Sequence, residues 1–177
     1  FIIDAGNMNS GENRILAEMI QARDLKPVMA VNTHGHFDHV GGVKWLKDTY
    51  GVAFACSSKD QFLIDSTAGG MVYGIQCNEV PAIDIDLDAV EDIRFGNTLL
   101  RVIKTPGHTP GHVVLFNAED KSLFTGDTLF RESIGRTDLP GGDYSWIMRS
   151  IIDNILPLGD EVKLYPGHGE DSTNGHE

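Results

Sequence analysis

Four side chains able to bind a metal ion occur within one short segment, in the order His34, His36, Asp38 and His39. Two histidines separated by one residue can present both imidazoles to a single ion when the backbone forms a tight loop. The Asp-His pair that follows directly after them then faces a second ion. The segment therefore predicts a metal site with nitrogen and oxygen ligands and with room for two ions.

More candidate ligands follow, each placed where an apolar, β-branched stretch gives way to glycine and proline. They are His108 and His112 in one glycine-rich loop, then Asp127 and His168. Such transitions mark the ends of strands, and ligands at strand ends can converge. The expected ligands are His34, His36 and one histidine of that loop for the first ion, Asp38, His39 and His168 for the second, and Asp127 as a bridge between both.

Two less reactive interpretations compete with this one. The histidines could form a closed zinc site with four ligands, or they could be ordinary core residues that satisfy one another. Seven convergent donors exceed what one tetrahedral ion uses. Core packing does not explain four donors packed into residues 34–39. Both interpretations are therefore disfavoured.

Composition limits the partners of the chain. It has 177 residues, 41% of them hydrophobic and 23% charged, and a formal net charge of −12. This size and balance are typical of one globular domain with a substantial core, here residues 1–177. Strong negative charge argues against a nucleic-acid partner, because such a partner requires a basic surface.

Cysteine usage and hydropathy give weaker signals about localisation. Cys56 and Cys77 lie far apart without a CxxC motif, as in a protein whose thiols stay reduced. No apolar stretch reaches the roughly 18 residues of a membrane span, and no signal peptide opens the chain. We expect a cytoplasmic protein with no membrane partner.

The elements that must position the first ligands alternate between strands and helices. Apolar stretches predict strands at residues 1–4, 28–33 and 52–56. Apolar residues at helical spacing predict helices at residues 10–24 and 40–50. The histidine segment would therefore connect a strand to a helix.

The later part of the chain changes character. Residues 83–92, rich in aspartate, are assigned to a solvated strand or loop. An amphipathic helix is expected at residues 143–155, with Asp143 as its N-cap, before a last strand at residues 162–165. Two sheets flanked by helices, an α/β fold, should result. The remaining segments predict short, mostly antiparallel strands at residues 93–95, 99–105, 113–116 and 122–125.

These ligands and their spacing resemble the pattern of the metallo-β-lactamase superfamily, and the resemblance runs over nearly the whole chain. It implies a four-layered αβ/βα sandwich with a dinuclear site on one edge. It also implies that His108, which precedes Thr109, is the loop ligand, so that His112 has a supporting or structural role. Asp127 stands where lactam-cleaving members typically have a cysteine, and His39 supplies a ligand for the second ion. Hydrolysis of antibiotics is therefore disfavoured.

Two further segments are similar to short, single-domain members of the glyoxalase II branch. They are residues 133–143, Ser-Ile-Gly-Arg-Thr-Asp-Leu-Pro-Gly-Gly-Asp, and residues 166–169, Pro-Gly-His-Gly. Full-length glyoxalase II enzymes add a C-terminal helical domain with glutathione contacts, and the strands before the first family turn are also missing here. The resemblance therefore implies a hydroxyacylglutathione hydrolase-like thioesterase whose chain is trimmed at both ends.

The chemistry expected from such a site needs no side-chain nucleophile. Two ions about 3.5 to 4 Å apart lower the pKa of a shared water to around 7 and so supply hydroxide. Zinc (Zn) is the expected metal, with Fe or Mn as alternatives. Asp38 and Asp127 are the candidates for proton transfer, and Arg131 and Arg136 for binding a small-molecule thioester or ester substrate.

Three alternatives remain open. One is a glutathione persulfide dioxygenase with a single iron, because that branch of the superfamily shares the Gly-Arg-Thr-Asp stretch seen at residues 135–138. Another is a lactonase or other ester hydrolase of the superfamily. The third is a non-enzymatic metal or interaction module, which would have a closed coordination sphere. Metal analysis separates these classes, since hydrolysis favours two zinc-like ions and oxygenation one redox-active iron.

Overall fold

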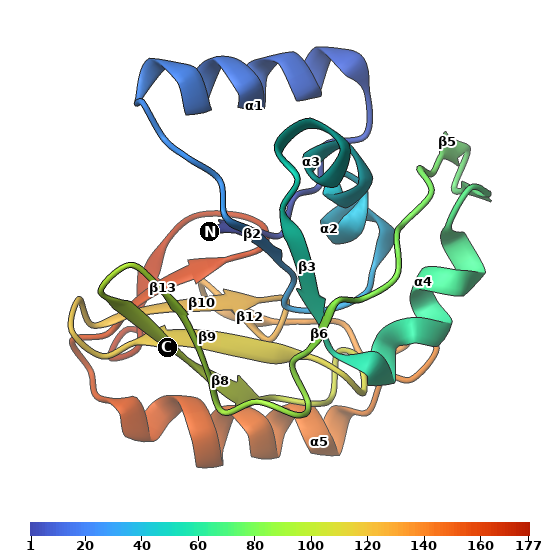
Figure 1. Ribbon diagram of the computed structural model, residues 1–177. Coiled ribbons are helices and arrows are strands. Elements are labelled where there is room, and N and C mark those ends of the chain that lie inside the picture. Colours follow the sequence, from blue (N-terminus) through green and yellow to red (C-terminus); the bar gives the residue numbers. More distant parts are fainter.

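A computed structural model describes residues 1–177 as two β-sheets packed face to face, with helices on both outer faces (Figure 1). The first sheet has four strands, and all its neighbouring pairs are parallel. Its strands, in spatial order, are β1 (Ile2–Ile3), β2 (Met29–Val31), β3 (Ala53–Cys56) and β6 (Ile85–Asp86).

The second sheet has six strands and is antiparallel except between β10 and β13. Two further hairpins pair β4 with β5 and β11 with β12. The strands of the large sheet, in spatial order, are β14 (Ser172–Thr173), β13 (Lys163–Pro166), β10 (Ser122–Gly126), β9 (Val113–Asn117), β8 (Thr98–Lys104) and β7 (Asp92–Phe95). The hairpin strands are β4 (Met71–Val72), β5 (Ile75–Gln76), β11 (Leu129–Phe130) and β12 (Ser133–Ile134).

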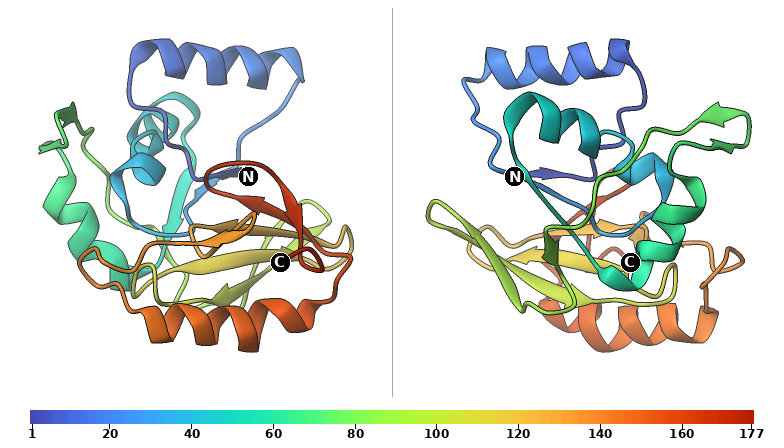
Figure 2. Two further views of the ribbon diagram at one scale, coloured as in Figure 1. Left: turned by 180° about the vertical axis from the view of Figure 1, so that it is seen from behind. Right: turned by 45° about the vertical axis from the view of Figure 1, so that its right-hand side comes forward.

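Helices cover the outer face of each sheet (Figure 2). On the first sheet lie α1 (Ser10–Ala22), the short α2 (Phe37–Val40) and α3 (Val43–Tyr50). On the second lies α5 (Tyr144–Ser150), which continues as a π-helical turn at Ile151–Ile155 and a 3₁₀ turn at Leu156–Leu158. Beside the sandwich, a 3₁₀ turn (Ser58–Asp60) and α4 (Gln61–Thr67) lead to the β4–β5 hairpin. None of these helices is both long and apolar enough to cross a membrane.

Three buried apolar clusters hold the layers together, because strands alternate their side chains between two faces. In β9, Val113 and Leu115 point to the cluster between the two sheets. Val114 and Phe116 on the same strand point to the cluster under α5 and its π-helical turn. The third cluster joins α3 to the first sheet. The order helices, sheet, sheet, helices is the αβ/βα sandwich that the family resemblance implies.

Two expected helices differ from the structure. The helix expected at residues 40–50 is divided, because α2 ends at Val40 and α3 begins at Val43. Gly41 and Gly42 keep right-handed helical backbone angles, but the Gly42 N–H donates to the Ala5 carbonyl at 2.6 Å and so does not continue the hydrogen bonding of α2. The helix expected at residues 143–155 is α-helical only to Ser150. Within the aspartate-rich segment, residues 85–86 form β6, the edge strand of the first sheet.

Candidate metal centre

The predicted ligands come from four loops that meet where strands of both sheets end. The loop after β2 carries His34 and His36, and α2 carries the Asp-His pair. His108 lies between β8 and β9, Asp127 directly follows β10, and His168 follows β13. All seven lie in one cluster: His34, His36, Asp38, His39, His108, Asp127 and His168.

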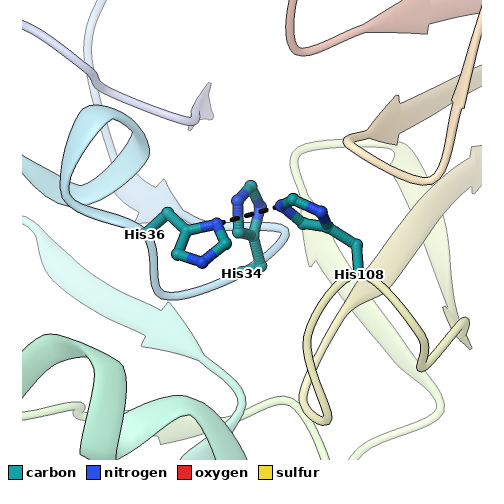
Figure 3. Close-up of side chains that lie close together, drawn as sticks. All are labelled: His34, His36 and His108. Carbon is teal, nitrogen blue, oxygen red and sulfur yellow. Dashed lines mark hydrogen bonds between the residues drawn. The ribbon is translucent and has the colours of Figure 1, made fainter. Parts of the chain in front are cut away.

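Three histidines form the first half of this cluster. One ligand atom from each of His34, His36 and His108 lies within 4.8 Å of those of the other two. The His108 Nε2 atom is 2.9 Å from His36 Nδ1, and the three rings approach one another edge to face (Figure 3). His34 Nε2 is buried and has no hydrogen-bond partner. The three nitrogens could therefore all contact one ion.

The second half combines carboxylate and imidazole groups. Ligand atoms of Asp38, His39 and His168 also lie within 4.8 Å of one another. The His168 Nε2 atom is 3.2 Å from His39 Nε2 and 3.4 Å from Asp38 Oδ2. Side chains of Asp38 and His168 are 42% and 56% exposed, so this half faces solvent.

Asp127 stands between the two halves. Its Oδ1 atom is 3.4 Å from His39 Nε2, and its Oδ2 atom is 3.6 Å from His108 Nε2 and 3.7 Å from His168 Nε2. The Oδ1 atom is buried without a hydrogen-bond partner. One carboxylate thus reaches nitrogens of both histidine groups.

The donor set fits divalent metal ions. Imidazole and carboxylate are the ligands that zinc, iron and manganese accept in proteins. Buried polar atoms without a partner are rare and costly, and His34 Nε2 and Asp127 Oδ1 both become satisfied if a cation lies between them and their neighbours. The types of donor in the cluster and its two unpartnered buried atoms therefore both fit a metal site.

Burial and neighbouring charges set the protonation of the ligands. Burial lowers the pKa of His34, His36 and His108, with that of His36 falling to about 4. These rings are neutral at physiological pH and keep a lone pair for a metal. Burial also opposes the charged form of His39, but the carboxylates of Asp127 and Asp4, which lie 3.4 and 3.1 Å from its ring nitrogens, outweigh burial and raise its pKa to about 10. Asp127 and Asp4 therefore favour a positive charge at the position of the His39 ring.

Neighbouring groups fix the orientation of the ligand rings. Asp4 Oδ2 is 3.1 Å from His39 Nδ1, which leaves Nε2 pointing into the cluster. The same carboxylate accepts hydrogen bonds from the N–H and the hydroxyl of Thr33, both at 2.7 Å. His108 Nδ1 donates to the Arg136 carbonyl at 2.8 Å. Asp4 was not predicted from the sequence, because an aspartate at the end of a strand carries no signal of its partner 35 residues away.

His112 lies outside both groups of donors. Its Nε2 atom accepts the Asp127 N–H at 3.0 Å, and its Nδ1 atom is 3.0 Å from Thr105 Oγ1 and 2.9 Å from Thr128 Oγ1. Burial holds the pKa of His112 well below its usual value, so the ring is neutral. The hydrogen bond to its Nε2 atom positions the backbone of Asp127.

A cavity of about 650 Å³ opens beside the cluster. Arg136 is the basic side chain that lines it besides the histidines, and both its Nε and NH2 atoms bind the Asp138 carboxylate at 2.8 Å. Arg131 is not among the lining residues and pairs with Glu170 at 2.7 Å. Apolar and aromatic residues from α2, α4, both hairpins and the following loop form much of the wall: Phe37, Leu63, Val72, Tyr73, Phe130, Ile134 and Leu139.

Comparison with known proteins shows what the chain is similar to. The profile of the metallo-beta-lactamase superfamily matches residues 1–168. Hydroxyacylglutathione hydrolase GloC of Haemophilus influenzae is 38% identical over 183 residues, which cover 99% of this chain and 82% of that protein. The crystal structure of BLEG-1 B3 metallo-beta-lactamase matches with a TM-score of 0.89 at 32% identity, over 98% of this chain and 83% of that one. TTHA1623 in a di-iron-bound form matches with a TM-score of 0.86 at 33% identity, over 98% and 84%.

Proposed function

The chain belongs to the metallo-beta-lactamase superfamily, and from that membership we propose that it hydrolyses small-molecule thioesters of the hydroxyacylglutathione kind with two divalent metal ions. In this proposal the first ion binds three histidines, the second binds Asp38, His39 and His168, and Asp127 contacts both. Zinc is the expected metal, with iron or manganese as alternatives. The residues for the first ion are His34, His36 and His108.

The observation that carries the proposal is the position of Asp127. Its two oxygens lie 3.4 to 3.7 Å from nitrogens of both donor groups. A site for one ion does not need two groups of three donors joined by a shared carboxylate. The arrangement suits a pair of ions, and the di-iron form of TTHA1623 supports the same interpretation.

Bound ions would supply Lewis acidity at the thioester carbonyl and an acidified water as the nucleophile. The cavity offers no activated hydroxyl in their place. The hydroxyls of Ser66 and Thr67 line it but donate to the Leu63 carbonyl at 2.8 and 3.0 Å, and the Ser133 hydroxyl, also in the lining, is not hydrogen-bonded to any base. Asp38, partly exposed at the cavity, is the carboxylate best placed to take up or return a proton. Asp127 would hold the reacting groups in place.

The substrate class follows from the relatives and the cavity. GloC of Haemophilus influenzae carries the name hydroxyacylglutathione hydrolase. The apolar wall next to the ligands suits the acyl part of a thioester, and Arg136 is the one cationic side chain that could reach a substrate carboxylate. A small-molecule partner therefore fits better than a macromolecular one.

Metal analysis combined with a substrate screen tests this proposal. We expect two ions per chain, hydrolysis of S-lactoylglutathione, loss of activity with a chelator and recovery with zinc. A protein that leaves thioesters intact but consumes oxygen with glutathione persulfide, and holds one iron, would be a dioxygenase instead. Hydrolysis of a β-lactam or a lactone in preference to the thioester would assign the other hydrolase branches, and the match to BLEG-1 makes the β-lactam a necessary member of the screen.

Arg136→Ala should separate binding of the glutathione carboxylates from chemistry. Because Asp138 already occupies the guanidinium, we expect only a roughly three- to tenfold increase in KM for S-lactoylglutathione, with little change in kcat. The His108 ring stays held, since it is the backbone carbonyl of residue 136 that accepts its N–H. A truncated thioester without those carboxylates should show no change.

Arg131→Ala is the matched control, because this arginine pairs with Glu170 outside the cavity. It should leave KM unchanged for both thioesters. Equal effects of Arg136→Ala on the full and truncated substrates would show that this arginine does not bind the carboxylates.

A further inference from the structure

One buried carboxylate lies beneath the first histidine group without belonging to it. Asp60 is 0% exposed and ends the 3₁₀ turn that precedes α4. Its side chain forms no cap on its own helix. It points instead at two loops that are far away in the sequence. An ionised carboxylate offers about four acceptor positions, and a buried one needs them filled.

Three hydrogen bonds connect Asp60 to both of those loops. Its Oδ2 atom accepts the Gly35 N–H at 2.9 Å and the Thr109 hydroxyl at 2.7 Å. Its Oδ1 atom accepts the Gly111 N–H at 2.7 Å. Gly35 is the residue between His34 and His36, and Thr109 directly follows His108. One side chain therefore ties together the backbones that carry all three histidines of the first group.

The fit between Asp60 and these loops is close. A Cβ atom at position 35 would come within 2.8 Å of Asp60 Cβ, and one at position 111 within 2.6 Å of Asp60 Oδ1. Such distances do not occur between unstrained atoms, so glycine at both positions allows the backbone to approach the carboxylate. By contrast, no hydrogen bond joins Asp60 to the loops that carry Asp127 and His168.

We propose that Asp60 is a positioning residue that sets the separation of His34 and His36 from His108, and so the affinity for the first ion alone. The inference rests on the proposed two-ion site. Asp38, His39 and His168, which would hold the second ion, form no hydrogen bond with Asp60, and the His39 ring is oriented by Asp4 instead. Loss of the Asp60 hydrogen bonds should therefore affect the two ions unequally.

Asp60→Asn is the sharpest test, because it preserves the volume of the side chain but replaces one carboxylate oxygen with an NH2 donor. That NH2 group would face either the Gly111 N–H or the donors of Gly35 and Thr109, so hydrogen bonds are lost in both orientations. The probe is cobalt(II), titrated into metal-free protein and followed by its visible absorption. We expect one ion to bind about 10- to 100-fold more weakly and the other to bind as in the wild type. Asp84→Asn is the control, since that carboxylate accepts the Phe54 N–H at 2.8 Å away from the ligand loops.

Thr109 supplies a milder pair of variants if Asp60→Asn fails to fold. Thr109→Val removes one of the three hydrogen bonds and should weaken the first ion by roughly three- to tenfold, whereas Thr109→Ser keeps the hydroxyl and should bind as the wild type. Equal weakening of both ions, or no weakening of either, would overturn the positioning role. Wild-type protein that binds fewer than two ions would instead contradict the proposed function, so the two failures are distinct.

Discussion

Asp127→Ala should abolish the two-ion site. The substitution removes the only carboxylate within reach of both donor groups and leaves nitrogens of His39, His108 and His168 without their shared counter-charge. Outer groups that merely orient metal ligands already cost about 10- to 100-fold in affinity or activity when lost. Loss of a shared carboxylate should exceed that, and we expect thioester hydrolysis to fall by at least roughly a thousandfold.

Metal content measured together with activity shows whether Asp127 contacts both ions or only one of them. Asp127→Ala should lose both ions or bind them at unequal, much lower affinity. Asp38→Ala is the informative comparison, because Asp38 contacts only the second group and its loss should leave the first ion bound. An Asp127→Ala protein that retains two ions and full activity would show that this carboxylate does not bridge.

The charge of Asp127 explains why the effect should be large at neutral pH. Burial opposes ionisation of this carboxyl, but the protonated His39 ring 3.4 Å from its Oδ1 atom outweighs burial and, with the other histidines nearby, lowers its pKa below the usual value. The group is therefore a carboxylate throughout the physiological range. Asp127→Asn, which removes the charge but keeps the shape, should behave more like alanine than like the wild type.

The segments that carry the candidate ligands were predictable, because the signal that marks each of them lies within a few neighbouring residues. His34, His36, Asp38 and His39 share one stretch of chain, and the more distant ligands each follow a strand that ends in glycine or proline. The apolar stretches made those strands recognisable. Once two sheets pack on each other, the loops that follow the strands come together at one edge. The αβ/βα sandwich expected from the family resemblance is confirmed.

The supporting carboxylates were not predictable for the opposite reason. Asp60 is a residue of a three-residue turn. The three groups that donate hydrogen bonds to its carboxylate lie 25, 49 and 51 residues away in the sequence. Asp4 likewise needs the register of β1 against β2 to bring it to Thr33. Neither pairing has a sequence signature, because each depends on which backbones meet after the sheets have packed.

The wall of the cavity was also missed from the sequence. Residues 57–76 show no clear periodicity, yet they form α4 and the β4–β5 hairpin, which supply Leu63, Val72 and Tyr73 to the cavity. Helix α4 has only seven residues, too few for apolar spacing to establish a pattern. Of the two arginines expected to bind substrate, only Arg136 reaches this wall.

Gly167→Ala should damage the site by adding a single methyl group. Gly167 directly precedes His168, and its N–H donates to the Gly126 carbonyl at 2.8 Å, which holds the loop against Asp127. A Cβ atom there would collide with Asp127 Oδ1 and come within 2.7 Å of His39 Cε1. One of these two ligands must move. Displacement of a reacting group by about 1 Å can cost a hundredfold, so we expect a loss of roughly that size in kcat/KM.

The stability of the metal-free protein separates this effect from general misfolding. Gly167 is exposed and its φ lies outside the left-handed region, so alanine is compatible with the backbone and the unfolding free energy should change by no more than about 1 kcal/mol. Gly11→Ala is the control, because the added Cβ would lie 3.1 Å from the flexible side chain of Asn9, on a helix far from the ligands. Wild-type metal content and activity in Gly167→Ala would mean that the loop yields to the methyl group, and that Asp127 and His39 are held less rigidly than their close contacts indicate.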